Sequence, residues 1–165
     1  MKWVFRYFHG TSDYGLCYQG RPGLEKVLDI HGFVDADCAG DLEYRRSTSG
    51  YVFNLFGGAV SWISKKKFAV ALSTIEAEYM AVTHASKEVV WLHRLCSSMA
   101  LVQRAIRIDC DSQSAIFLAK NPAYHSKTKH IDVQYHFVRD MIEDKTVLLV
   151  KVDTLKNTAD ALKNL

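Results

Sequence analysis

The sequence predicts an α/β fold, of the α+β type with a mixed β-sheet, in which helices pack on the sheet. Two patterns predict it: three antiparallel strand-like segments come first, the last two joined by a short turn, and helices then alternate with strands as in βαβ units. Composition agrees, because 48% of the 165 residues are hydrophobic and 24% are charged. Such a chain can bury a core of its own, which excludes disorder as the default and favours one globular domain.

The first half of the chain supplies the antiparallel part of the predicted sheet. Ile30–Asp37 is β-like, and the strands predicted at 50–56 and 59–64 flank Gly57-Gly58, a two-residue loop that suits a primed hairpin turn. Ahead of them lies an aromatic cluster at residues 3–8, followed by a short predicted strand at 15–18. The first segment alone cannot bury its aromatic rings.

The second half begins with a long helix and then alternates. Ser73 and Glu76 have the spacing of a capping box, which predicts a helix starting at Ser73. We expect the following elements after it: a strand at 105–110, helices at 112–120 and 131–143, a strand at 146–152, and a short last helix from about Thr158.

Glu78 stands out on the long helix. Positions 78, 82, 85, 89, 92, 96 and 99 share one face, and all except Glu78 are apolar. An ionised carboxylate on a core-facing stripe costs several kcal/mol unless it is paired or binds a metal. Glu78 therefore either belongs to a site or reaches solvent past the helix end, whereas the capping box already explains Glu76.

Further acids lie at the ends of predicted elements. Asp35 and Asp37 share one face of the first strand, and either could be the functional residue. Asp111 follows a strand and precedes a helix, so a helix N-cap is an alternative role for it. Asp160 lies in the first turn of the last helix, where the helix dipole alone would favour a carboxylate. Together with Glu78, this order of acids across one mixed sheet indicates a site more strongly than any single acid does.

Seven motifs carry a resemblance to the ribonuclease H domain of copia-type retrotransposon polyproteins. They are FVDADCAGD at 33–41, RRSTSGY at 45–51, SWISKKK at 61–67, EAEYMA at 76–81, CDSQSA at 110–115, KTKHID at 127–132 and ADAL at 159–162. The resemblance covers about residues 30–165. Residues 1–28 resemble the tail of the connection segment that follows the reverse transcriptase. The resemblance therefore implies a ribonuclease H-like domain at 29–165 and a connection-segment remnant at 1–28.

The resemblance implies four acids that are both catalytic and metal-binding: Asp35, Glu78, Asp111 and Asp160. It favours Asp35 over Asp37 and Asp111 over Asp109. The implied reaction is endonucleolytic hydrolysis of the RNA strand of an RNA·DNA hybrid by a two-metal mechanism. Carboxylates are hard oxygen ligands, so two Mg²⁺ ions are expected, or Mn²⁺ in their place. The four cysteines have no C-x-x-C spacing, so we expect them to be reduced and not to form a zinc site.

Basic and polar residues are candidates for holding the nucleic acid, although each basic cluster could equally be a solvated loop. The candidates are Arg45, Arg46, Ser49, Lys65, Lys66, Gln113, Lys127, Lys129 and His130. The net charge of +3 permits a nucleic-acid partner. Besides the hybrid, a reverse transcriptase domain is an expected partner, with the aromatic residues 3–8 as the docking surface.

No apolar run in the chain reaches the length of a membrane span, so no membrane partner is expected. We expect an intracellular protein, cytoplasmic within a virus-like particle or nuclear. Three positions depart from the family: Cys38 stands where Trp is common, a single Lys163 follows ADAL, and the loop 153–157 has no histidine. The alternative function is therefore a decayed or domesticated, non-catalytic module that keeps the fold and binds nucleic acid or a protein.

Overall fold

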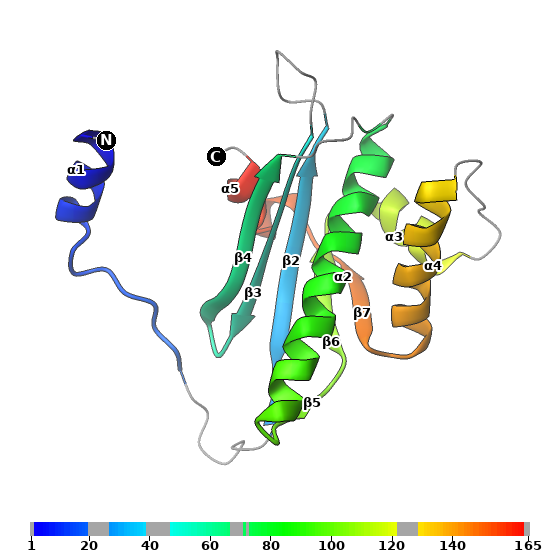
Figure 1. Cartoon of the computed structure of the whole chain (residues 1–165). Helices are drawn as coiled ribbons and strands as arrows, with labels where there is room; N and C mark the ends of the chain where they lie inside the picture. The colour runs from blue at the N-terminus through cyan, green and yellow to red at the C-terminus, as the bar shows by residue number, and fades with distance from the viewer. Residues whose placement is uncertain are drawn as a thin grey trace.

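A five-stranded sheet is the centre of the fold (Figure 1). The computed structural model describes residues 2–19, 27–38, 47–66, 71, 73–121 and 129–163. The strands are β2 (Ile30–Asp37), β3 (Thr48–Leu55), β4 (Gly58–Lys66), β6 (Ile106–Cys110) and β7 (Val147–Lys151), in the spatial order β4-β3-β2-β6-β7. β2, β3 and β4 are antiparallel, whereas β6 runs parallel to both β2 and β7. The predicted mixed sheet is confirmed.

Helices lie on both faces of this sheet. The long α2 (Thr74–Ser98) covers one face, and α3 (Gln113–Lys120) and α4 (Lys129–Glu143) pack beside it (Figure 1). The hydroxyl of Tyr51 in β3 donates to Glu88 of α2, whereas α5 (Asp160–Lys163) packs on the neighbouring Gly50. Because successive residues of a strand point to opposite faces, α5 lies on the face away from α2. The core between α2 and the sheet includes the fully buried Phe53 and Val89.

The capping box in the sequence places the start of the long helix correctly, whereas the N-cap of the next helix differs from the expectation. Ser73 is the N-cap of α2, and its side chain accepts a hydrogen bond from the backbone N–H of Glu76 at 3.2 Å. Ser112 is the N-cap of α3 and accepts from the backbone N–H of Ala115. The N-cap role considered for Asp111 is therefore wrong. The last helix begins at Asp160, two residues later than predicted.

The β3–β4 turn differs from the prediction by one residue. Leu55 pairs with Gly58, so the two-residue loop is Phe56-Gly57 and not Gly57-Gly58. Both loop residues have positive φ, 51° and 85°, as a type I′ turn requires. Gly58 is the first residue of β4, and the ring of Tyr18 requires glycine there because a Cβ would lie 2.5 Å from Tyr18 Cε1.

The first segment contains a helix, α1 (Lys2–Gly10), none of whose residues is buried. Figure 1 shows this helix standing away from the sheet. The strand predicted at 15–18 is wrong: Tyr18 and Gln19 approach the β3–β4 hairpin through one side-chain and one backbone hydrogen bond, without forming a ladder.

Two short elements complete the fold. β1 (Val27–Leu28) pairs in parallel with β5 (Val102–Gln103), and strands of two residues are too short to give a recognisable sequence pattern. Thr154–Lys156 form a 3-10 helix. Residues before position 29 already contact the rest of the fold, through Tyr18 and Gln19 at the hairpin and through β1 at β5. The division into domains 1–28 and 29–165 stays a prediction. No helix in the described ranges has both the length and the apolar character needed to cross a membrane.

Candidate metal centre

Two strands bring Asp35 and Asp111 to the same end of the sheet. In the parallel pair of β2 and β6, Val34 is the partner of Cys110, so the next residues along each strand are Asp35 and Asp111. Residues at equivalent positions of paired strands point to the same face. Asp35 is only 1% exposed, and its Oδ1 accepts a hydrogen bond of 2.8 Å from the backbone N–H of Ala36.

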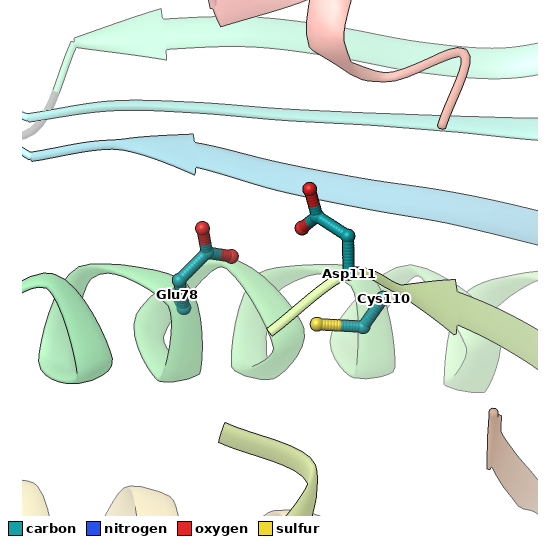
Figure 2. A group of neighbouring side chains, drawn as sticks. All are labelled: Glu78, Cys110 and Asp111. Atoms are coloured by element: carbon teal, nitrogen blue, oxygen red, sulfur yellow. The ribbon is translucent and has the colours of Figure 1, made fainter. Parts of the chain in front are cut away.

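Glu78 reaches the same end of the sheet from α2, the helix that covers one face. The apolar stripe is confirmed, because Val82, Ala85 and Val89 are fully buried, and Glu78 itself is only 6% exposed. The alternative in which Glu78 reaches solvent is therefore wrong. Ligand atoms of Glu78, Cys110 and Asp111 all lie within 4.8 Å of one another (Figure 2). We call this group, together with Asp35, the acid end of the sheet.

The acid end is electrostatically suited to a cation. Burial, together with the smaller effect of the nearby charges of Glu78, Asp111 and Asp35, raises the pKa of the Cys110 thiol to about 12. The same carboxylates that disfavour a thiolate attract positive charge. Their oxygens are the hard donors that Mg²⁺ and Mn²⁺ prefer, so these residues fit a divalent ion.

The segment that carries Asp160 packs directly over the acid end. Gly50 is the cross-strand partner of Asp35, and a Cβ on Gly50 would lie 2.7 Å from Leu162 Cβ and 3.3 Å from the carbonyl oxygen of Ala159. Ser64 of β4 donates a hydrogen bond of 2.6 Å to the carbonyl oxygen of Leu162. Asp160 is not one of the three residues whose ligand atoms cluster within 4.8 Å. The helix that carries Asp160 therefore packs next to the acid end, but the Asp160 carboxylate is not part of the cluster of Glu78, Cys110 and Asp111.

Asn157 ties this last segment to the strand that carries Asp35. Its side chain is 4% exposed, its Nδ2 donates to the carbonyl oxygen of Val34 at 2.9 Å, and its Oδ1 accepts from the backbone N–H of Ala159 at 3.2 Å. The amide therefore links the residue before Asp35 to the residue before Asp160. Sequence reasoning missed this role, because nothing local to Asn157 indicates a partner more than a hundred positions away.

The structure also gives the rival acid Asp109 a separate explanation. Asp109 is fully buried and forms an ion pair of 2.8 Å with Arg107, two residues earlier on the same strand. Asp37, the last residue of β2, is half-buried and is not in the cluster of Glu78, Cys110 and Asp111. The ion pair of Asp109 favours Asp111 as the site residue. Asp35, which like Asp37 is outside that cluster, is favoured by its burial at 1% exposure and by the effect of its charge on the pKa of Cys110.

Several of the candidate nucleic-acid contacts surround the acid end. Lys65 and Lys66 lie at the end of β4 that pairs with Ser49 and Thr48, and Thr48 in turn pairs with Asp37. Both lysines are exposed, as is Gln113 in the first turn of α3. These three side chains are therefore placed to meet a ligand bound at the acid end.

Other candidates are placed differently. Ser49 is 4% exposed and faces the α2 side of β3, so its contact with nucleic acid stays a prediction. Arg45, Arg46 and Lys127 lie outside the described residues, and Lys129 and His130 are described only as the first residues of α4.

Sequence reasoning missed Lys151. This exposed residue ends β7, its Nζ donates to the backbone carbonyl oxygen of Asp111, and it lines a shallow, open pocket with Val152, Asp153 and Thr154. A lysine at the end of a strand gives no sequence pattern by which it could have been found.

Known proteins resemble the chain in sequence and in fold. The Retrovirus-related Pol polyprotein from transposon TNT 1-94 of Nicotiana tabacum is 47% identical over 162 residues, which cover 98% of this chain and 12% of the polyprotein. The crystal structure of LC11-RNase H1 in complex with RNA/DNA hybrid matches 82% of this chain and 94% of its own, with a TM-score of 0.61 and 17% identity. The chain is a ribonuclease H-fold domain of the retrotransposon Pol kind. No protein-family profile matches it.

A second solved structure resembles this ribonuclease H-fold domain over part of a larger chain. Prototype Foamy Virus Protease-Reverse Transcriptase aligns with 92% of this chain and 22% of its own, at a TM-score of 0.58 and 13% identity. At such low identity the likeness shows the fold alone. The ribonuclease H-fold domain spans about an eighth of the length of the tobacco polyprotein.

Proposed function

We propose that this domain hydrolyses the RNA strand of RNA·DNA hybrids endonucleolytically, with divalent ions held by Asp35, Glu78, Asp111 and Asp160. The observation that carries the proposal is the buried position of Glu78 on an apolar helix stripe, where its carboxylate meets Asp111 from another element. A charge buried at this position destabilises the fold unless a bound ligand offsets the cost. The nuclease and hydrolase kind of the domain agrees with its fold and its homologues.

The proposed chemistry divides between the ion and the chain. Mg²⁺ or Mn²⁺, when bound, activates a water and stabilises the leaving oxygen of an in-line displacement at phosphorus. Asp35 lies in β2 and Glu78 in α2, and Asp111 directly follows β6, so regular elements position all three carboxylates. The backbone N–H of Ala36 orients Asp35, and Asn157 holds the start of α5 against β2. This order in the absence of ligand is what efficient electrostatic catalysis requires.

The proposed substrate fits the surroundings of the acid end. Lys65, Lys66 and Lys151 are exposed there, on β4 and β7. Such side chains position a phosphate backbone without reading its sequence. Discrimination for RNA would come from its 2′-hydroxyl and from the A-like groove of the hybrid. The structural relative crystallised with an RNA/DNA hybrid supports this choice of substrate.

We also propose association with a reverse transcriptase domain. The support is the Pol polyprotein homology and the likeness to a protease-reverse transcriptase. The surface proposed for this contact is α1, which exposes Trp3, Phe5 and Phe8.

The decisive experiment compares Asp35→Asn with Asp37→Asn. The neutral amide at position 35 keeps the shape and loses a charge that holds metal, so cleavage of labelled RNA in a hybrid should fall by about 100-fold or more. Circular dichroism should show an unchanged fold. Asp37→Asn, on the same strand, should stay within a few-fold of wild type.

Undiminished cutting by Asp35→Asn, or equal cutting of duplex DNA, would contradict the proposal. A wild-type chain that binds the hybrid but leaves it intact with and without Mg²⁺ would instead support the non-catalytic module.

A further inference from the structure

A thiol lies among the carboxylates of the acid end and has no part in the proposed function. Cys110 is fully buried at the end of β6, and its Sγ lies within 4.8 Å of ligand atoms of both Glu78 and Asp111. Figure 2 shows the thiol below the two carboxylates, which point to the same side. Mg²⁺ takes oxygen ligands, so a sulfur in this position adds nothing to a magnesium site.

We propose that Glu78, Cys110 and Asp111 form a site for a thiophilic divalent ion, Zn²⁺ or Cd²⁺, and that this ion excludes Mg²⁺ from the acid end. Thiolate ligands select soft or borderline metals, and carboxylates complete such sites. The binding part stands on the geometry of three side chains. The exclusion of Mg²⁺ rests on the proposed function.

The distances allow this ligand set. Zn²⁺ binds sulfur at about 2.3 Å and carboxylate oxygen at about 2.0–2.2 Å, so neighbouring ligand atoms of a tetrahedral site are about 3.5 Å apart. The three ligand atoms lie within 4.8 Å of one another, so each must move by no more than about 1 Å. The side chain of Glu78 has three rotatable bonds and can make this movement without a change in α2. A fourth position stays open to water.

Binding exchanges a proton for the ion. The Sγ–H bond breaks, its proton passes to solvent, and the sulfur electron pair forms the bond to Zn²⁺ or Cd²⁺. The weak hydrogen bond from the thiol to the carbonyl oxygen of Ser112, at 3.9 Å, is lost in this exchange. No electron is transferred. Mg²⁺ forms no comparable bond to sulfur, and the thiol keeps its proton when Mg²⁺ is bound.

The experiment uses the full chain and Co²⁺ as a spectroscopic probe for Zn²⁺. Wild type titrated with Co²⁺ should show a sulfur-to-cobalt charge-transfer band that saturates at one equivalent and disappears when Zn²⁺ is added. Cys110→Ser should lack this band. Cys38→Ser is the matched control and should keep it, because Cys38 lies at the end of β2 outside the cluster.

A measurement on the wild type alone guards against misfolding of the variant. Zinc-edge X-ray absorption of the equimolar Zn²⁺ complex should show one sulfur at about 2.3 Å beside oxygen ligands. A first shell of oxygen and nitrogen only would overturn the proposal, as would a cobalt band that survives in folded Cys110→Ser.

The second part of the experiment measures inhibition. In excess Mg²⁺, the Zn²⁺ concentration that halves hybrid cleavage should be at least tenfold higher for Cys110→Ser than for wild type or Cys38→Ser, each relative to its own rate without Zn²⁺. Equal sensitivity would overturn the exclusion of Mg²⁺. If the chain binds Co²⁺ through sulfur but cuts no hybrid, the proposed function fails and the metal site stands, so the two failures are distinguishable.

Discussion

The acid end of the sheet and helix α1 depart from the usual distribution of residues in opposite directions. Asp35 is 1% exposed and Glu78 is 6% exposed, although carboxylates are seldom fully buried. Trp3 is 77% exposed and Phe5 is 68% exposed, although large aromatic side chains are usually covered. One region encloses charge, and the other presents apolar surface.

The two regions are held in place by different means. The acid end is fixed by contacts between distant parts of the chain: the β2–β6 register, the bond from Asn157 to Val34, and the packing of α5 on Gly50. Helix α1 contributes no buried side chain to the fold. A preorganised site is therefore recognised by long-range contacts in the chain as well as by unusual residues. Contacts within the chain bury the acidic side chains of the acid end, whereas the apolar side chains of α1 would need another protein surface to cover them.

The sharpest test of the acid end separates Glu78 from Glu76, which lie about 200° apart around α2. Glu78→Gln should lower hybrid cleavage by about 100-fold or more, because it removes a charge that holds metal. Without metal, its free energy of unfolding should equal or exceed that of wild type, because a buried charge beside Asp111 is relieved. Cleavage assays and urea melts in a chelator measure both effects.

Glu76→Gln is the matched control for this test. It keeps the backbone N–H that Ser73 accepts, so activity should stay near wild type and stability should change by no more than about 0.5–1 kcal/mol. If Glu76→Gln were the inactive variant, the assignment of the helix face would be wrong.

A second test asks whether the packing of α5 matters to the acid end. Gly50→Ala places a Cβ 2.7 Å from Leu162 Cβ, which must push α5 and Asp160 away from β2. We expect a stability loss of about 1–3 kcal/mol and a fall in cleavage of about tenfold or more. Gly32→Ala is the control, because its Cβ would meet the ring of Phe53 in the core at 2.4 Å. It should cost similar stability, measured by urea melts, and keep cleavage at temperatures where it is folded.

Much of the fold could be predicted from local patterns in the sequence. Alternation of side chains located β2, and the spacing of Ser73 and Glu76 located the start of α2, because each pattern acts within one element. The turn at Phe56-Gly57 was predicted one residue too late, because the glycine at position 58 is required by the ring of Tyr18, forty residues earlier, and not by the turn. The pairing of β1 with β5 was missed for the same reason, since two residues carry no periodicity.

The site shows the same limit more clearly. Helix periodicity alone singled out Glu78, and burial confirmed that it faces inward. The choice of Asp35 over Asp37 came from a family resemblance, because two residues on one strand face have the same local pattern. Asn157, Lys151 and Cys110 were missed because their roles depend on neighbours brought close by the sheet.

A third test examines the basic rim of the acid end. If Lys65 and Lys66 contact phosphates, the double Lys→Gln variant should flatten the log–log salt dependence of hybrid affinity by about 0.7–0.9 per lost contact. Lys145→Gln is the control, because Lys145 precedes β7 at the opposite end of the sheet and is also exposed. Fluorescence anisotropy over a range of salt concentrations gives the slopes. Equal slopes for the double variant and wild type would mean that these lysines are only solvated.

The smallest effect on stability is expected at α1. Replacing Trp3, Phe5 and Phe8 together by serine should change the free energy of unfolding by no more than about 0.5 kcal/mol, because no buried contact is lost. Tyr18→Phe is the matched change, since it removes the hydroxyl that donates to Ala59 at 2.8 Å, and it should cost about 1 kcal/mol. Urea melts followed by circular dichroism compare the two. A large loss from the triple variant would show that α1 packs on the domain in solution, and its apolar face would then not be available to a partner protein.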